Sequence, residues 1–362
     1  MFQTSSERVV LLGMSNSEEA RHRTELQTSP GCQLRAASAY FSWAFLLSPI
    51  WAAPAADPTN HCLTRQDTSF TDYAYVYFTG EGYSNGEQIY MAVSNNNDPT
   101  QWTTLKNGQP FLTTDVGTKG IRDPSLIVAP DRSKFWIIAT DLKVNGLPGG
   151  WSNTDMQTKG SKSLVVWEST DLRNWSGPRL ARVSPDNAGM TWAPDAIWDP
   201  ERNAFMVYWT SNVLSTANGI QAGWKILRCY TNDFKTFTKT EEYLSGYGMD
   251  VTITAADNGL FYMITKNGPN GLIQENVAYN GLSGAWKKVS ENIGQGALPS
   301  GEGPLIFRNN KDRSKWHLWI DNNTKGSGYM PFETTNIAGG QYTKTQDYKL
   351  PANPRHGYVI PM

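Results

Sequence analysis

The sequence predicts an all-β fold, a five-bladed β-propeller whose ring is closed by the C-terminal strand. Three observations predict it. A short phrase recurs five times, each copy follows an apolar run of strand length, and a helical period of three to four is sustained nowhere. Units of roughly sixty residues cannot bury their own faces, so they must pack against one another, as the blades of a propeller do.

The recurring phrase is Ser or Thr, any residue, Asp or Asn, a short turn, and then an aromatic residue that begins a second short strand. Its copies lie at 94–102, 169–175, 231–237, 279–286 and 334–342. The apolar runs that precede them lie at 75–78, 135–139, 205–209, 260–264 and 316–320. Each unit therefore supplies several short strands joined by tight turns.

Four of the units open with a further strand, at 123–127, 195–198, 250–253 and 302–306. The N-terminal unit lacks this strand, and the end of the chain, 357–360, is the natural candidate to supply it. Closing the ring in this way removes exposed strand edges. We therefore expect the C-terminus to be essential to the fold.

We divide the chain into an N-terminal extension with a secretion signal, residues 1–56, and a catalytic propeller, residues 57–362. Residues 39–56 carry no charge, follow Arg35 and end in Ala53-Pro54-Ala55, which is typical of a signal-peptidase site. A membrane anchor is the alternative, because the apolar stretch approaches spanning length. The signal predicts a secreted, extracellular protein. Cys62 and Cys229 then remain as a pair in an oxidising compartment, and whether they form a disulfide stays open.

The charge balance bears on the partner. The formal net charge is −1, and no run of Lys or Arg forms a phosphate-binding stripe, which argues against nucleic acid. A neutral ligand fits better. We expect no membrane contact after the signal is removed, and a monomer.

Acidic residues begin the strands that would line the central channel. Residues at these positions converge at one mouth of the ring, and the four are Asp123, Asp195, Asp250 and Glu302. Converging carboxyls raise one another's pKa and cost stability, so packing alone explains them poorly, although any single Asp here can be a turn device. Carboxyls around a neutral, hydroxyl-rich ligand suit the cleavage of glycosidic bonds, and calcium binding is the competing use.

Three segments around these residues carry a family resemblance: Arg122-Asp-Pro-Ser, Trp192-Ala-Pro-Asp and Gly301-Glu-Gly-Pro. In this order they resemble glycoside hydrolase family 43, five-bladed arabinosidases, xylosidases and arabinanases. The resemblance implies an inverting mechanism with Asp123 as base, Asp250 as pKa modulator and Glu302 as acid.

The resemblance also implies residues that bind the substrate. Asp195 would lie at the pocket wall, Trp192 would face the sugar, and Arg122 would join them. His356 matches a histidine near the channel that binds water or a cation, so Ca²⁺ or water is expected beside it, and no cofactor is required.

The chain departs from the family pattern in two places. An incomplete unit precedes Asp123, and Asp250 lies in Met-Asp-Val-Thr where the family has Asp-Pro-Ser. Arg-Asp-Pro also occurs in the related fructan-cutting propellers, which retain configuration, but Gly-Glu-Gly-Pro favours family 43.

The function expected from the resemblance is an exo-acting α-L-arabinofuranosidase on arabinan-type plant cell-wall polysaccharide or oligosaccharide. β-Xylosidase, endo-arabinanase and exo-galactanase are alternatives on the same fold. A sugar-binding propeller without catalysis and a structural propeller are alternatives of other classes. Loops 145–162 and 214–224 are expected to rim the site.

Overall fold

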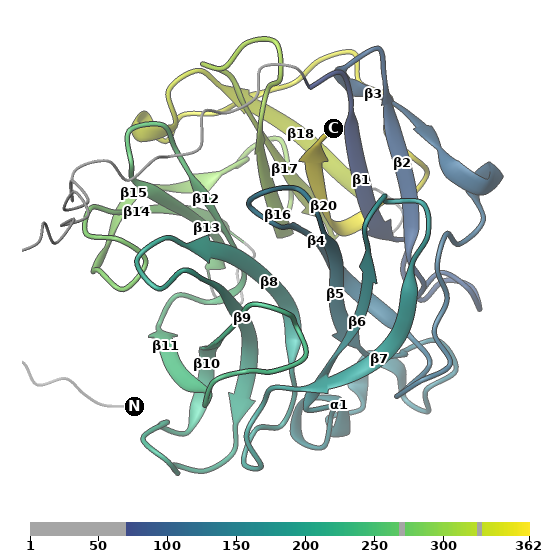
Figure 1. Cartoon of the computed structure of the whole chain (residues 1–362), viewed down its shortest axis with the longest axis vertical. Helices are drawn as coiled ribbons and strands as arrows, with labels where there is room; N and C mark the ends of the chain where they lie inside the picture. The colour runs from purple at the N-terminus through teal and green to yellow at the C-terminus, as the bar shows by residue number, and fades with distance from the viewer. Residues whose placement is uncertain (1–69, 268–271, 324–327) are drawn as a thin grey trace, which may run out of the picture. The chain divides into compact units, whose positions relative to one another are not determined.

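The computed structural model describes residues 70–267, 272–323 and 328–362. They form five antiparallel sheets of four strands, the blades, arranged around a common centre (Figure 1). The prediction of a five-bladed propeller is confirmed. From the innermost strand outward, the blades are as follows: blade 1 is β20 (Arg355–Pro361), β1 (Tyr73–Phe78), β2 (Tyr90–Asn95) and β3 (Asp98–Thr104); blade 2 is β4 (Ile121–Val128), β5 (Phe135–Asp141), β6 (Ser163–Ser169) and β7 (Ser176–Arg182); blade 3 is β8 (Trp192–Asp199), β9 (Ala204–Val213), β10 (Gly223–Thr231) and β11 (Glu241–Ser245); blade 4 is β12 (Met249–Ala255), β13 (Phe261–Asn267), β14 (Leu272–Ala278) and β15 (Trp286–Ile293); blade 5 is β16 (Gly301–Arg308), β17 (Trp316–Asn322), β18 (Gly328–Thr334) and β19 (Thr343–Lys344).

Helical segments are short and lie in the connections. They are α1 (Asp155–Thr158) and the 3₁₀ turns η1 (Leu105–Gly108), η2 (Gly150–Ser152) and η3 (Ile337–Gly339). In the part of the chain that the structure describes, no helix has the length and apolar character needed to cross a membrane.

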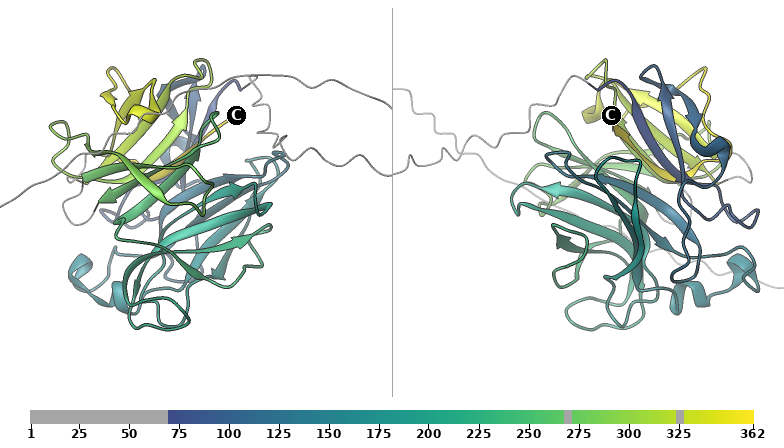
Figure 2. Two further views of the ribbon diagram at one scale, coloured as in Figure 1. Left: turned by 90° about the vertical axis from the view of Figure 1, so that its left-hand side faces the viewer. Right: turned by 45° about the vertical axis from the view of Figure 1, so that its right-hand side comes forward.

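The C-terminal strand closes the ring, as the sequence predicts. β20 pairs antiparallel with β1, from Tyr73 opposite Pro361 to Phe78 opposite Arg355. The chain end therefore lies beside the first strand in each view (Figure 2). The five innermost strands contact one another in the cyclic order β20, β4, β8, β12, β16. The C-terminal segment is thus the inner wall of blade 1.

The hydrophobic core is divided among the five interfaces between neighbouring blades. In β9, Phe205 and Val207 pack toward blade 2, while the alternate residues Met206 and Tyr208 pack toward blade 4. Both faces of such a strand are buried, and this explains why the second strands are continuous apolar runs in the sequence. The other three interfaces have corresponding clusters within the described residues.

The recurring phrase forms the turn between the third and fourth strands of a blade. Ser169 Oγ accepts hydrogen bonds from the backbone N–H groups of Asp171 and Leu172, at 3.1 and 3.0 Å. Asp171 Oδ1 accepts from Asn174 N–H at 2.7 Å, and Trp175 Nε1 donates to Leu172 O at 3.1 Å. The hydroxyl and the carboxylate thus satisfy backbone groups that the turn would otherwise leave unpaired.

Each innermost strand contains one β-bulge at the same place. In β4, for example, Arg122 pairs with Thr140 and Ser125 with Ile138, so three steps on β4 face two on β5. Equivalent register shifts lie at 192–195, 249–252, 302–305 and 355–358. The second residue of every bulge has a positive φ, and these residues are Asp123, Ala193, Asp250, Gly303 and His356. A bulge bends its strand and redirects side chains, here at one end of all five inner strands.

The predictions for the N-terminal extension, residues 1–56, and for Cys62 fall outside the described residues. Cys229 is a free thiol in the described part of the chain, packed in the cluster between blades 2 and 3. Burial raises its pKa to about 12.

Candidate active site

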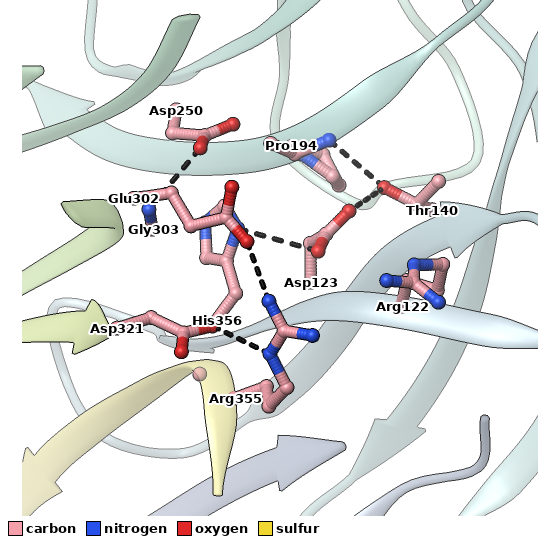
Figure 3. Close-up of polar contacts among 12 residues, drawn as sticks. Arg122, Asp123, Thr140, Pro194, Asp250, Glu302, Gly303, Asp321, Arg355 and His356 are labelled. Carbon is pink, nitrogen blue, oxygen red and sulfur yellow. Dashed lines mark hydrogen bonds and ion pairs between the residues drawn. The ribbon is translucent and has the colours of Figure 1, made fainter. Parts of the chain in front are cut away.

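A cavity of about 820 Å³ lies at the end of the ring where the innermost strands begin. Its floor is formed by the first two residues of the bulges, which are Arg122, Asp123, Trp192, Met249, Asp250, Glu302, Arg355 and His356. The three carboxyls expected to carry the chemistry, Asp123, Asp250 and Glu302, therefore line one cavity from three blades. Figure 3 shows them around the imidazole of His356.

Asp123 is held by an imidazole and a hydroxyl. His356 Nδ1 lies 3.2 Å from Asp123 Oδ1, and Thr140 Oγ1 donates to Asp123 Oδ2 at 2.8 Å. Thr140 itself accepts from Ala193 N–H at 2.8 Å, which fixes the direction in which its hydroxyl proton points. Burial alone would raise the pKa of Asp123, but His356 and Arg122 bring it below its ordinary value.

His356 carries the matching shift. Burial alone would lower its pKa, yet the nearby Asp123, with Asp250 and Asp321, raises it to about 9. The imidazole is therefore protonated at neutral pH. Gly303 is required beside it, because a Cβ at position 303 would lie 2.6 Å from His356 Cγ.

Glu302 lies between two cations. Lys266 Nζ is 3.0 Å from its Oε2, and Arg355 Nη2 contacts its Oε1. Burial alone would raise the pKa of Glu302, but Lys266 and then Arg355 lower it below the ordinary range. In the absence of substrate this carboxyl is ionised.

Asp250 supports the strand that carries Glu302. Its Oδ2 accepts a hydrogen bond from Gly303 N–H at 3.1 Å, directly after Glu302 in the chain. Its pKa is raised, first by burial and further by the charges of Glu302 and Asp123, against the opposing effect of His356 and Lys266. Asp250 is thus the carboxyl of the three that retains a proton most readily.

Aromatic rings form one side of the cavity. Trp151 is 48% exposed and meets Trp192 edge to face, with ring centroids 6.2 Å apart. Trp224, 41% exposed, lines the same cavity. Trp151 and Trp224 come from the two loops expected to rim the site, and flat exposed rings of this kind suit the apolar face of a sugar.

Arg122 anchors this aromatic side. Its guanidinium lies 4.6 Å from the centroid of Phe78 and 4.7 Å from that of Trp151, and it pairs with Glu81 and Glu87 at 3.0 and 2.8 Å. Trp151 Nε1 also donates to Glu81 at 2.8 Å. Arg122 borders the cavity, but its printed contacts hold the Trp151 loop in place.

The expectation that Asp195 lies at the pocket wall is wrong. Asp195 is the fourth residue of its bulge, equivalent to Ser125 and Thr252, and it is 3% exposed beneath the cavity floor. It accepts hydrogen bonds from Tyr208 Oη at 2.9 Å and Thr252 Oγ1 at 3.0 Å. Burial raises its pKa to about 6. Asp195 links inner strands and does not line the cavity.

Sequence reasoning missed three charged residues of the site: Lys266, Asp321 and Arg355. Lys266 and Asp321 lie near the ends of second strands, directly opposite Met249 and Glu302 in the ladders. Arg355 precedes His356 and occupies the bulge position of Arg122. Aligning the five inner strands in the sequence would have identified Arg355, but pairing positions on the second strands were needed for the other two.

The expected Ca²⁺ or water beside His356 can be compared with the groups around it. Calcium takes six to eight oxygen ligands. Here the nearest group is a protonated imidazole bonded to Asp123, and it repels a cation. No group of three or more His, Cys, Asp or Glu side chains in the described ranges is arranged to hold a metal. The charge of this pair disfavours Ca²⁺, and we propose a bound water there.

The sequence also matches known proteins. A family model described as "Probable glycosyl hydrolase domain", related to glycoside hydrolase family 43, matches residues 68–362. An α-L-arabinofuranosidase of Bifidobacterium longum subsp. longum is 34% identical over 219 residues, which are 56% of this chain and 20% of that protein.

Solved structures with a similar chain include two exo-β-1,3-galactanases. The one from Phanerochaete chrysosporium has a TM-score of 0.46 and 14% identity, with 64% of this chain and 52% of that chain covered. The one from Clostridium thermocellum has a TM-score of 0.45 and 10% identity, with 62% and 48% covered. Since the family model spans most of its length, this chain belongs to the glycosyl hydrolase family related to glycoside hydrolase family 43.

Proposed function

We propose that this chain is a secreted, exo-acting α-L-arabinofuranosidase that inverts configuration, with Asp123 as base and Glu302 as acid. Its substrate would be an arabinan-type plant polysaccharide or an oligosaccharide derived from it. The observation that carries the proposal is the cavity with three carboxyls from three blades, in which Asp123 is held ionised and Glu302 lies within the same space.

The environment of Asp123 supports its role as base. A base must be ionised when the water arrives, and His356 and Thr140 stabilise the charged form through an ion pair and a hydrogen bond. The same contacts fix the orientation of the carboxylate. In an inverting reaction it would remove a proton from water as the water attacks the anomeric carbon.

Asp250 would act on Glu302 in two ways. Its hydrogen bond to Gly303 N–H positions the backbone next to the acid, and its own charge, when present, favours the protonated form of Glu302. Glu302 would then protonate the departing glycosidic oxygen. Lys266 and Arg355 oppose this in the empty site, so the mechanism requires that the substrate weaken at least one of these two ion pairs.

The sugar is proposed from the curated relative, whose described activity is that of an α-L-arabinofuranosidase. The aromatic side of the cavity agrees with a carbohydrate ligand, and its volume is within the range of small-molecule sites. Exo action is proposed because the site is a cavity bordered by Trp151 and Trp224.

The test is hydrolysis of aryl α-L-arabinofuranoside and aryl β-D-xyloside by the wild type, Glu302→Gln and Asp123→Asn. The expected result is arabinofuranoside cleavage that Asp123→Asn abolishes. Glu302→Gln should reduce it least for aryl groups that leave without a proton, by about 10²–10⁴-fold for poor leaving groups. Glu291→Gln, an exposed carboxyl paired with Lys288, is the matched control.

Each other outcome has a distinct meaning. Cleavage of the xyloside alone would replace the proposed sugar, and full activity in both variants would refute the assigned roles. Oligosaccharide binding without any cleavage would indicate a sugar-binding propeller. Proton NMR of the first product anomer would separate inversion from retention.

Secretion is a separate part of the proposal, supported by residues 39–56 of the sequence. Expression of the full chain in a secreting host should release a protein whose N-terminus, by mass spectrometry, follows the Ala53-Pro54-Ala55 segment. Full-length protein retained in the membrane fraction would favour an anchor.

A further inference from the structure

We propose that Asp321 is a positioning residue that competes with Glu302 for the guanidinium of Arg355, and so allows Glu302 to take up the proton it must donate. This inference rests on the proposed function, because it concerns the acid of that reaction. Neither the family resemblance nor the roles proposed above use Asp321.

Arg355 bridges the two carboxylates. Its Nε donates to Asp321 Oδ2 at 2.9 Å, while its Nη2 contacts Glu302 Oε1 (Figure 3). Asp321 lies at the end of β17, opposite Glu302 in the β16–β17 ladder. The Asp321 side chain is 1% exposed and that of Arg355 is 22% exposed, so Asp321 is the fixed partner and Arg355 the one that a ligand can reach.

Asp321 has an unused acceptor. Among the described residues, its buried Oδ1 makes no hydrogen bond. A guanidinium binds a carboxylate best through two parallel N–H bonds, and here Asp321 receives only one because the other arm of Arg355 points to Glu302. A rotation of Arg355 onto Asp321 would satisfy Oδ1 and release Glu302.

A substrate can drive this exchange because Arg355 lines the cavity. A sugar hydroxyl or the glycosidic oxygen placed beside Glu302 would occupy the space of the Arg355 arm and take over the Glu302 oxygen. Asp321 then keeps the displaced guanidinium paired within the protein, where an unpaired buried cation would be unfavourable.

The surrounding charges leave room for one proton on the carboxyls. The groups that face Glu302 come from β4, β12, β13, β17 and β20. The anions, with Glu302 itself, are Asp123, Asp250, Glu302 and Asp321, and the cations are Lys266, Arg355 and His356. Four carboxyls against three cations reach neutrality when one carboxyl is protonated. Arg355 is therefore the cation whose position decides which carboxyl retains that proton.

The test uses Asp321→Asn, which keeps the size of the side chain and one acceptor for Arg355 but removes the competing charge. With the only charged partner of Arg355 now at Glu302, the ion pair strengthens and repulsion from Asp321 disappears. Both effects lower the pKa of Glu302, by about one unit. Side-chain ¹³C NMR of Glu-labelled protein, assigned by comparison with Glu302→Gln, measures this pKa without any need for activity.

Kinetics provide the second measurement. In Asp321→Asn the alkaline limb of kcat/KM should move to lower pH by the same amount, and kcat should fall about tenfold for poor leaving groups and little for good ones. Arg355→Gln should shift the Glu302 titration in the opposite direction. Asp257→Asn is the matched control, since Asp257 forms an Asp–Arg pair with Arg308 outside the cavity.

The outcomes separate this inference from the proposed function. An unchanged or raised pKa of Glu302 in Asp321→Asn would overturn the inference, whether or not the protein is active. An equal loss of activity for all leaving groups, without a pH shift, would also overturn it and indicate a structural role. Absence of glycosidase activity in the wild type, with the NMR shift present, would refute the proposed function while the coupling stands.

Discussion

The ion pair of Asp123 and His356 predicts a specific pH dependence of stability. Burial alone would lower the pKa of His356, but Asp123 raises it from 6.5 to about 9. Because the folded value is above the unfolded value, the folded state binds this proton more tightly. The resulting stabilisation is fully present below pH 6.5 and is lost as the pH rises through about 9. A difference of about 2.5 units corresponds to about 3 kcal/mol.

The perturbation that isolates this contribution is His356→Asn. Asn tolerates the positive φ at this position and does not titrate, so the pH-dependent part of the contribution disappears while the other groups remain. The free energy of unfolding would be measured by urea titration with tryptophan fluorescence at pH 6, 7.5 and 9.5. The wild type minus variant difference should fall by about 3 kcal/mol across this range, with a slope of at most about 1.4 kcal/mol per pH unit.

The control is Asp123→Asn, which leaves the imidazole but removes the main cause of its shift. In that variant the pH-dependent difference should shrink substantially, because burial then lowers the pKa of His356. A wild type minus His356→Asn difference that stays constant from pH 6 to 9.5 would refute the charge assigned to His356. A difference that grows with pH would refute the sign.

Three further predictions concern the ring, the rim and the buried thiol. Deleting residues 355–362 removes β20, so the cooperative urea transition and the near-UV circular dichroism should be lost; an intact transition would show that blade 1 does not need this strand. Trp151→Ala should raise KM for an arabino-oligosaccharide roughly fivefold with little change in kcat, since an exposed ring contributes about 1 kcal/mol of stacking; an unchanged KM would remove Trp151 from the substrate path. Cys229 should react with Ellman's reagent only after unfolding, because its thiol is fully buried and its pKa is raised to about 12; rapid labelling of the native protein would contradict its place in the core.

Much of the fold could be predicted because each blade carries the same local signals. The Ser/Thr-x-Asp turn has hydrogen bonds that depend on residues within a few positions, as at Ser169 and Asp171. The alternating burial of second strands such as β9 leaves a continuous apolar run in the sequence. Even the closing strand could be assigned, because one blade lacked an inner strand and the chain end supplied one.

The site was predictable only where side-chain direction followed from strand position. Asp195 and Asp123 both appear to begin an inner strand, but the bulge puts Asp195 two positions beyond the equivalent of Asp123, below the floor. A bulge leaves no clear trace in a single sequence. Lys266 and Asp321 were missed for another reason, because their positions depend on the register between two strands.

The five bulges explain how one repeated fold produces an asymmetric site. Each supplies a residue with positive φ at the same level, occupied by Asp123, Ala193, Asp250, Gly303 and His356. Outside glycine this conformation costs roughly 1–2 kcal/mol per residue, which is large against the stability of a typical domain. Glycine at all five positions would relieve the strain, so strain at four of them points to function. The two small residues contribute as well: Gly303 leaves room for the His356 ring, and Ala193 N–H orients the Thr140 hydroxyl that holds Asp123. The backbone thus repeats fivefold, and the side chains at this one position give each blade a different part of the chemistry.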